Sequence, residues 1–289
     1  MPTHHKQNVM SLYPLKTIAE IGLERLDKCS QIVGQIFYRA VRPCFALDDL
    51  NQPVAFGSCF FIQLDGARYL VTAAHVLDQA ERTPVYISGR TSLVALTGLF
   101  SVTNKPGGNR NNDHYDFAFV ELSEHQCNEI EVEFFITEDM ISKNRVAKES
   151  RGYMALGFPH SLQLVSHETL RAFTEAWTFV GFHHQSPELN EGIGITGNEH
   201  FTIRFQNRVK KFNGPERDAV EPQGASGGIL IDLGNFDPSK LHPDAPCKGL
   251  LAGILIEHHR AHETIMATDI QFVISHIRLS KRESQKQIS

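Results

Sequence analysis

The stretch Gly224-Ala225-Ser226-Gly227-Gly228, followed by the apolar run 229–231, decides the expected fold. A serine among glycines exposes its hydroxyl group and lets backbone N–H groups converge on one point. In one arrangement such a serine occupies a strand-to-helix turn, and its acid and histidine follow it in the chain. In the other arrangement the histidine and the aspartate precede it. Here a short β-like run ending at Gly234 follows the serine, and no strand–helix alternation precedes it, which favours the second arrangement.

A histidine and an aspartate with suitable surroundings do precede this serine. The segment Val71-Thr72-Ala73-Ala74-His75 places His75 just past an apolar strand. The segment Tyr115-Asp116-Phe117-Ala118 places Asp116 at the entrance to another strand, where backbone pairing can hold it fixed. A serine hydroxyl becomes a nucleophile when a histidine removes its proton and an acid orients that histidine. The three residues therefore predict nucleophilic catalysis.

In this order, Thr-Ala-Ala-His, Asp-x-Ala and Gly-x-Ser-Gly-Gly resemble the motifs of the trypsin-like, chymotrypsin-fold serine peptidases. Three short motifs in family order are more specific than any one of them. The resemblance covers about residues 33–277. Gly57-Ser58-Cys59-Phe60 and the segment 154–159 are similar to the HtrA-like branch, and we expect an intracellular member without a PDZ domain.

The resemblance implies a catalytic triad of His75, Asp116 and Ser226. It also implies an oxyanion hole formed by the backbone N–H groups of Gly224 and Ser226. The expected activity is endopeptidase hydrolysis of protein or peptide substrates through an acyl-enzyme, with no metal or organic cofactor. Substrate preference rests on the residue six positions before the serine, Val220, which favours apolar or small side chains. Loop length varies in this region, and a shift of two residues in the alignment with the family would place Asp218 at this position and favour substrates with Arg or Lys.

Two departures from the family pattern bear on regulation. The residue before the serine is Ala225, whereas zymogen-activated members have an aspartate that pairs with a newly cut N-terminus. Packing, substrate or a partner must therefore organise the oxyanion loop, and we expect control by a regulatory protein partner or a conformational switch. The residue directly after His75 is Val76 and not a cysteine, so the family's disulfide beside the histidine is missing.

The expected architecture is all-β, with two six-stranded antiparallel β-barrels between an N-terminal and a C-terminal helix. Helical spacing covers residues 13–30 and resumes at 270–277, and short apolar runs beginning at 35–38 predict strands. Asp65-Gly66 predicts a tight hairpin. We expect an N-terminal extension at 1–32, a first barrel at 33–141, a second barrel with the closing helix at 142–277, and a charged tail at 278–289.

Composition excludes several other classes of protein. The 289 residues include 28 Lys+Arg and 33 Asp+Glu, a net charge of -5 that argues against nucleic-acid binding. No apolar run approaches the length of a membrane span, and the N-terminus lacks the apolar core of a secretion signal. The five cysteines are odd in number and scattered, which predicts a reduced, cytoplasmic location.

Other interpretations carry less weight. The pair His183-His184 and the group His258-His259-x-x-His262 suggest a metal, but the pattern lacks the glutamate of a zincin, and we expect no metal site. Arg208, Lys210 and Lys211 form a basic cluster that is most simply a solvated face. The functional alternatives are a non-catalytic interaction module on the same fold and an esterase-type α/β-hydrolase, which requires a parallel sheet.

Overall fold

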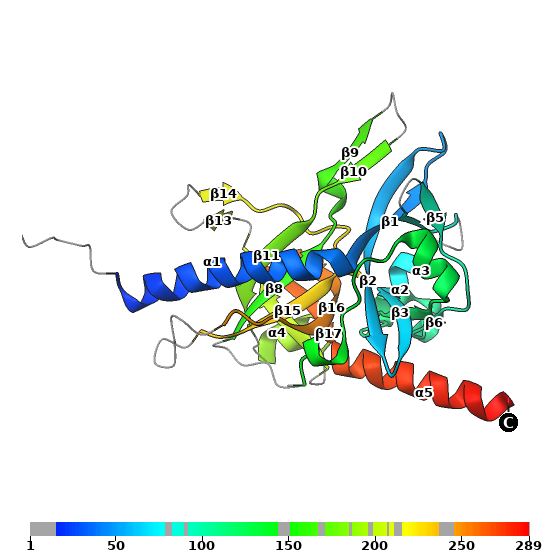
Figure 1. Cartoon of the computed structure of the whole chain (residues 1–289). Coiled ribbons are helices and arrows are strands. Elements are labelled where there is room, and N and C mark those ends of the chain that lie inside the picture. The colour runs from blue at the N-terminus through cyan, green and yellow to red at the C-terminus, as the bar shows by residue number, and fades with distance from the viewer. Residues whose placement is uncertain are drawn as a thin grey trace, which may run out of the picture.

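Two antiparallel sheets form the body of the protein, and a long helix leaves it at each end (Figure 1). The computed structural model describes residues 16–78, 83–89, 92–143, 151–166, 171–184, 187–195, 199–206, 208–210, 216–236 and 246–288. The fold is therefore mostly β, as the short apolar runs predict.

The first sheet carries seven strands among the described residues, in the order β5-β4-β1-β2-β3-β7-β6. The strands are β1 (Val41–Leu47), β2 (Pro53–Leu64), β3 (Ala67–Thr72), β4 (Tyr86–Ser88), β5 (Leu93–Ala95), β6 (Ser101–Val102) and β7 (Ala118–Glu121). The predicted hairpin at Asp65-Gly66 joins β2 to β3, and both residues have positive φ, 48° and 79°. Such values match the tight turn that the pair predicts.

The second sheet has the order β11-β8-β15-β16-β17-β12. Its strands are β8 (Arg151–Gly157), β11 (Trp177–Phe182), β12 (His200–Arg204), β15 (Ile229–Asn235), β16 (Leu250–His259) and β17 (Thr264–Asp269). Two short hairpins stand apart from it, formed by β9 (Gln163–Ser166) with β10 (Arg171–Thr174) and by β13 (Arg208–Lys210) with β14 (Glu216–Asp218).

Every strand pair in the described part of the chain runs antiparallel. This direction contradicts the α/β-hydrolase alternative, which requires a parallel sheet. The strand pairing does not confirm two closed six-stranded barrels. One sheet has seven strands instead of six, and its outermost strands, β5 and β6, each pair on one side only.

The N-terminal helix α1 spans Ile18–Phe37 and a 3₁₀ turn follows at Tyr38–Ala40, so the strand predicted at 35–38 is wrong. Its buried side chains are Leu26, Cys29, Val33 and Phe37, a spacing of three and four residues that continues the helical face past the predicted end. Ile18, the first residue of the helix, is 60% exposed, and the buried side chains begin at Leu26.

A disulfide joins Cys29 of α1 to Cys247, just before β16, across a sequence separation of 218. Spacing alone did not predict this pair, because the two cysteines meet only after α1 packs on the second sheet. The remaining three cysteines, Cys44, Cys59 and Cys127, are free and buried. The cytoplasmic location stays a prediction, and the disulfide gives it no support.

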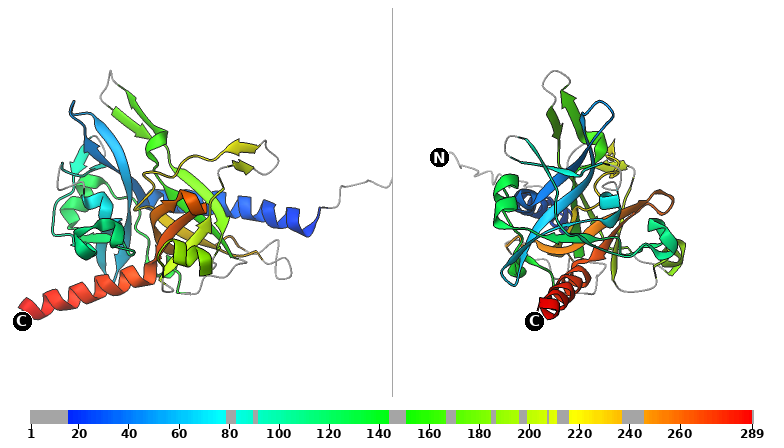
Figure 2. Two further views of the ribbon diagram at one scale, coloured as in Figure 1. Left: turned by 180° about the vertical axis from the view of Figure 1, so that it is seen from behind. Right: turned by 90° about the vertical axis from the view of Figure 1, so that its right-hand side faces the viewer.

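The C-terminal helix α5 spans Ile270–Ile288 and includes most of the segment predicted as a separate tail. Short helices α2 (Ala74–Asp78), α3 (Glu124–Ile130) and α4 (Pro187–Gly192) lie between strands. Figures 1 and 2 show α1 and α5 projecting from opposite ends of the body. No helix in the described ranges is long and apolar enough to cross a membrane.

One apolar core is shared by the two sheets. It joins Phe60, Ile62 and Val71 of the first sheet to Met154 and Ile231 of the second. Each sheet also has a smaller apolar cluster of its own. The shared core fixes the two sheets against each other, so residues carried by both can meet in one cleft.

Candidate active site

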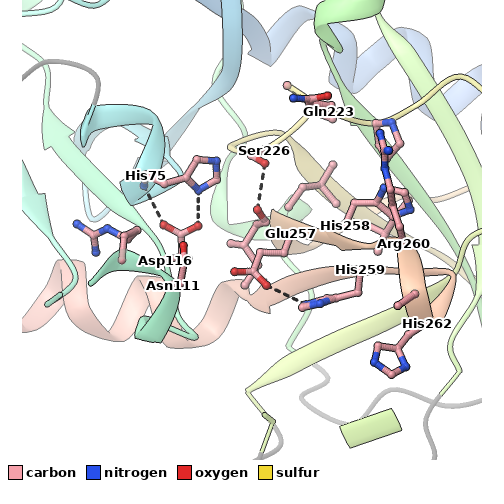
Figure 3. A pocket seen from close by; sticks show the side chains of 18 of the residues that line it. His75, Asn111, Asp116, Gln223, Ser226, Glu257, His258, His259, Arg260 and His262 are labelled. Carbon is pink, nitrogen blue, oxygen red and sulfur yellow. Dashed lines mark hydrogen bonds and ion pairs between the residues drawn. The ribbon is translucent and has the colours of Figure 1, made fainter. Parts of the chain in front are cut away.

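His75 and Asp116 lie in direct contact, as the sequence predicts for two members of a triad. His75 is the second residue of α2, just after β3, and its Nδ1 lies 2.5 Å from Asp116 Oδ2. The backbone N–H of His75 donates to Asp116 Oδ1 at 2.8 Å. One carboxylate thereby holds both the ring and the main chain of His75 (Figure 3).

Asp116 has a left-handed backbone conformation, and hydrogen bonds from neighbouring residues fix its position. Its φ is +43°, in the left-handed region that aspartate tolerates better than most residues. Its carbonyl oxygen accepts the N–H of Ala74 at 3.1 Å. Nearby, Arg110 bridges Asp113 (2.6 Å) and Asp78 of α2 (3.0 Å), and this ties the loop before Asp116 to the helix that carries His75.

Burial and charge compete at this pair. The Asp116 side chain is only 3% exposed and that of His75 is 37% exposed. Burial acts to lower the pKa of His75, but the hydrogen bond and the charge of Asp116 outweigh it and raise that pKa. Burial also raises the pKa of Asp116, and the contact with His75 opposes this rise.

Ser226 lies in the same cleft as the pair, on the loop that precedes β15. Its hydroxyl donates to the carbonyl oxygen of Ile256 at 3.0 Å and not to His75. Figure 3 shows the His75 ring and the Ser226 hydroxyl on the two sides of this cleft. The structure thus brings all three predicted residues to one site, with the serine hydroxyl bonded elsewhere.

The backbone N–H groups of Gly224 and Ser226 have no acceptor among the described residues. The Gln223 carbonyl accepts the N–H of His160 at 2.8 Å, so the N–H of Gly224, on the same trans peptide, points the opposite way. The Ala225 carbonyl accepts the N–H of Gly228 at 2.9 Å. The N–H of Ser226 belongs to the same trans peptide and therefore points away from Gly228. Such a pair of donors can stabilise an oxyanion.

The first sheet anchors the serine loop through Ser58 of β2. The Ser58 hydroxyl donates to the Gly224 carbonyl (3.2 Å) and accepts the N–H of Phe158 (2.9 Å), while the Ser58 N–H donates to the Ser226 carbonyl (2.8 Å). Gly227 is required at this approach: its φ is +83°, and a Cβ there would lie 1.9 Å from the Ser58 carbonyl oxygen. Internal hydrogen bonds therefore organise a loop that has Ala225 in place of aspartate.

The cleft has a volume of about 1000 Å³ and extends beyond the triad along the end of β16. Glu257 and His259 lie there in contact, with Glu257 Oε2 2.8 Å from His259 Nε2. The contact with His259 lowers the pKa of Glu257 against the opposing effect of burial. Our sequence analysis missed Glu257 and Arg110 as site residues, because no local motif marks them, and it quoted Ser58 only as part of a family-like segment without a role in the site.

Neither residue predicted to form the primary substrate pocket lines this cleft. Val220 is partly buried against the apolar cluster of the second sheet, and Asp218 is exposed at the end of β14. The histidine pairs form no metal-binding group within the described ranges. The side chains of the basic cluster at 208–211 lie outside the described residues.

No protein-family model and no curated protein matches this chain. Among solved structures, the MamO protease domain from Magnetospirillum magneticum, in its apo form, aligns with a TM-score of 0.47 and 12% identity, covering 84% of this chain and 98% of that chain. A chain from work on coupled folding and binding of the intrinsically disordered Sesbania mosaic virus VPg protein aligns with a TM-score of 0.44 and 13% identity, covering 80% and 87%. These weak likenesses assign no family and no activity, so function must be argued from the site.

Proposed function

We propose that the protein is a trypsin-like serine endopeptidase that uses His75, Asp116 and Ser226. The observation that carries this proposal is the His75–Asp116 pair in one cleft with a serine flanked by two unpartnered N–H donors. The sequence pattern of the HtrA-like branch is compatible with it. The substrates are proteins or peptides, and the reaction requires no cofactor.

In the proposed reaction, rotation of the Ser226 side chain moves its hydroxyl from the Ile256 carbonyl toward His75. His75 Nε2 takes the hydroxyl proton as the oxygen attacks the scissile carbonyl carbon, and the N–H groups of Gly224 and Ser226 stabilise the resulting oxyanion. The protonated His75 then gives its proton to the leaving amine, and the acyl-enzyme remains. Water, activated by His75, hydrolyses this ester and restores Ser226.

The hydrogen bond from Ser226 to Ile256 corresponds to a resting state. Substrate or a regulatory protein partner would supply the free energy that releases the hydroxyl. The same observation favours the second candidate function, a non-catalytic interaction module in which the serine never engages His75. The two candidates differ in whether Ser226 reacts with an electrophile.

The test is labelling with a fluorophosphonate probe together with cleavage of casein. We expect the wild-type protein to be labelled at Ser226 and to cut casein, and Ser226→Ala to lose both activities. Ser275→Ala removes a hydroxyl from α5, outside the cleft, and should behave as wild type. If wild type and Ser226→Ala are equally inert with every protein regulator tried, the peptidase proposal is wrong and the interaction module is favoured.

A further inference from the structure

One edge of β16 is open where it passes Ser226. β15 pairs with β16 only from Leu250 to Ile254, whereas β17 pairs with it as far as His259. From Ile256 to His259, no described strand therefore covers the edge opposite β17. These residues line the cleft, and the Ile256 carbonyl holds the Ser226 hydroxyl. An extended peptide can pair with such an edge through its main chain.

Side chains along this edge alternate between two directions. His258 packs edge-on against Phe205, with ring centroids 4.8 Å apart, and so belongs to the second sheet's apolar side. Glu257 and His259 share the opposite side, which explains their contact. Figure 3 shows the Glu257 carboxylate between His259 and the His75–Asp116 pair. Glu257 and His75 line the same cleft, and the charge of Glu257 acts to raise the pKa of His75.

Glu257 differs from the other charged groups that line the cleft, because it has no permanent cation as its partner and, unlike Asp116, it is not buried. Arg110 is bonded to Asp78 and Asp113, Asp116 is bonded to His75, and Arg260 lies 3.0 Å from Glu221. Glu257 contacts a histidine, which carries a full charge only when it is protonated. The Glu257 side chain is 34% exposed and therefore accessible to a ligand. A cationic group bound beside it would form a charge-assisted hydrogen bond.

We infer that Glu257 selects peptides with a lysine or arginine close to the scissile bond, at the substrate residue that lies between the open edge of β16 and His75. This inference rests on the proposed peptidase function and adds the substrate class. It assigns the preference to a residue of β16 and not to Val220 or Asp218, which are not among the residues that line the cleft. A hydrogen bond to a charged group in such a site corresponds to about 10- to 100-fold in affinity.

The first experiment measures cleavage of pooled internally quenched peptides, identical except for Lys, Gln or Glu fixed at one of four positions on either side of the scissile bond. At one position, wild type should prefer Lys over Glu by at least about tenfold in kcat/KM. Glu257→Gln should lose this preference and Glu257→Lys should reverse it. Glu263→Gln removes the same charge from the same hairpin, at a residue that does not line the cleft, and should retain it.

The second experiment separates this inference from the proposed chemistry. The same peptide pools are titrated against Ser226→Ala and against Ser226→Ala combined with Glu257→Gln, and binding is followed by fluorescence anisotropy. We expect tighter binding of the Lys pool to Ser226→Ala and no preference in the double variant. An equal response to the Lys and Glu pools in both proteins would overturn the inference. Absence of fluorophosphonate labelling in wild type would instead count against the peptidase function.

Discussion

At the scale of single residues, the Asp116 carboxylate controls both the orientation and the proton affinity of His75. It bonds the ring nitrogen and the backbone N–H of His75, and it raises the pKa of the ring above the ordinary value of 6.5 despite the opposing effect of burial. His75 must be neutral to accept a proton from Ser226. The protein should therefore be inactive below this raised pKa and gain activity as the pH rises through it.

We predict that the acid limb of the pH profile of kcat/KM lies above pH 6.5 and reports His75. Asp116→Asn removes the negative charge, so the limb should move to lower pH while kcat falls by about 10⁴-fold, the loss seen when a triad histidine loses its carboxylate. Asp139→Asn, an exposed change away from the cleft, is the control and should leave the profile unchanged. An acid limb at the same pH in wild type and Asp116→Asn would contradict this role.

The sequence could identify some site residues and not others, for a physical reason. His75, Asp116 and Ser226 each stand in a short motif whose neighbours set the local backbone, so the motif marks both residue type and place. Glu257 acquires its place only when β16 lies beside the first sheet. His160 acts through its backbone N–H, a group that nearly every residue type offers, so no side-chain pattern can reveal it.

At the scale of elements, strand β2 connects the first sheet to the serine loop. Its Ser58 bonds Gly224, Ser226 and Phe158, and its Ala55 is bonded through its N–H to the Gln163 side chain (2.8 Å). The Ser58 hydroxyl is fully buried and holds the peptide that follows Gly224. Loss of this hydroxyl would leave the Gly224 carbonyl and the Phe158 N–H without a buried partner.

We predict that Ser58→Ala lowers kcat by about 10- to 100-fold with little change in KM, because the oxyanion donors move while the edge of β16 stays in place. The rate of fluorophosphonate labelling should fall in parallel. Thr202→Val removes a different buried hydroxyl, which donates to the His184 carbonyl outside the cleft, and serves as the matched control. Equal losses of kcat in the two variants would show a general effect on stability and contradict the positioning role.

The predicted elements succeeded where a short apolar run is bounded by polar or turn residues. Such runs at 68–72, 201–205 and 264–267 fall almost entirely within β3, β12 and β17, because strands that are buried on both faces leave continuous apolar stretches in the sequence. Prediction failed at the end of α1, where Gln35–Phe37 looks like a strand in isolation. Burial of Phe37 against the shared core extends the helix through it, and that tertiary contact is invisible in a short window.

At the scale of the whole molecule, a long-range covalent link accompanies the packing of α1 on the second sheet. Val33 and Phe37 insert beside Gly249, where a Cβ would lie 2.2 Å from Val33, and the Cys29–Cys247 bond lies next to this contact. The two cysteines are 218 residues apart, and the bond closes a loop that contains the first sheet and the strands β8, β11, β12 and β15 of the second. A link of this kind stabilises mainly by restricting the unfolded chain.

We predict that Cys29→Ala, Cys247→Ala and the double variant each lower the free energy of unfolding by about 2–4 kcal/mol, the usual contribution of a disulfide. The losses should be nearly equal and not additive, because any of the three changes removes the same bond. Urea unfolding with and without dithiothreitol measures this: the reductant should destabilise wild type and have no further effect on the variants. Cys127→Ala, which removes a free buried cysteine, should remain sensitive to the reductant. If dithiothreitol left the unfolding midpoint of wild type unchanged, α1 would be held by its apolar face alone.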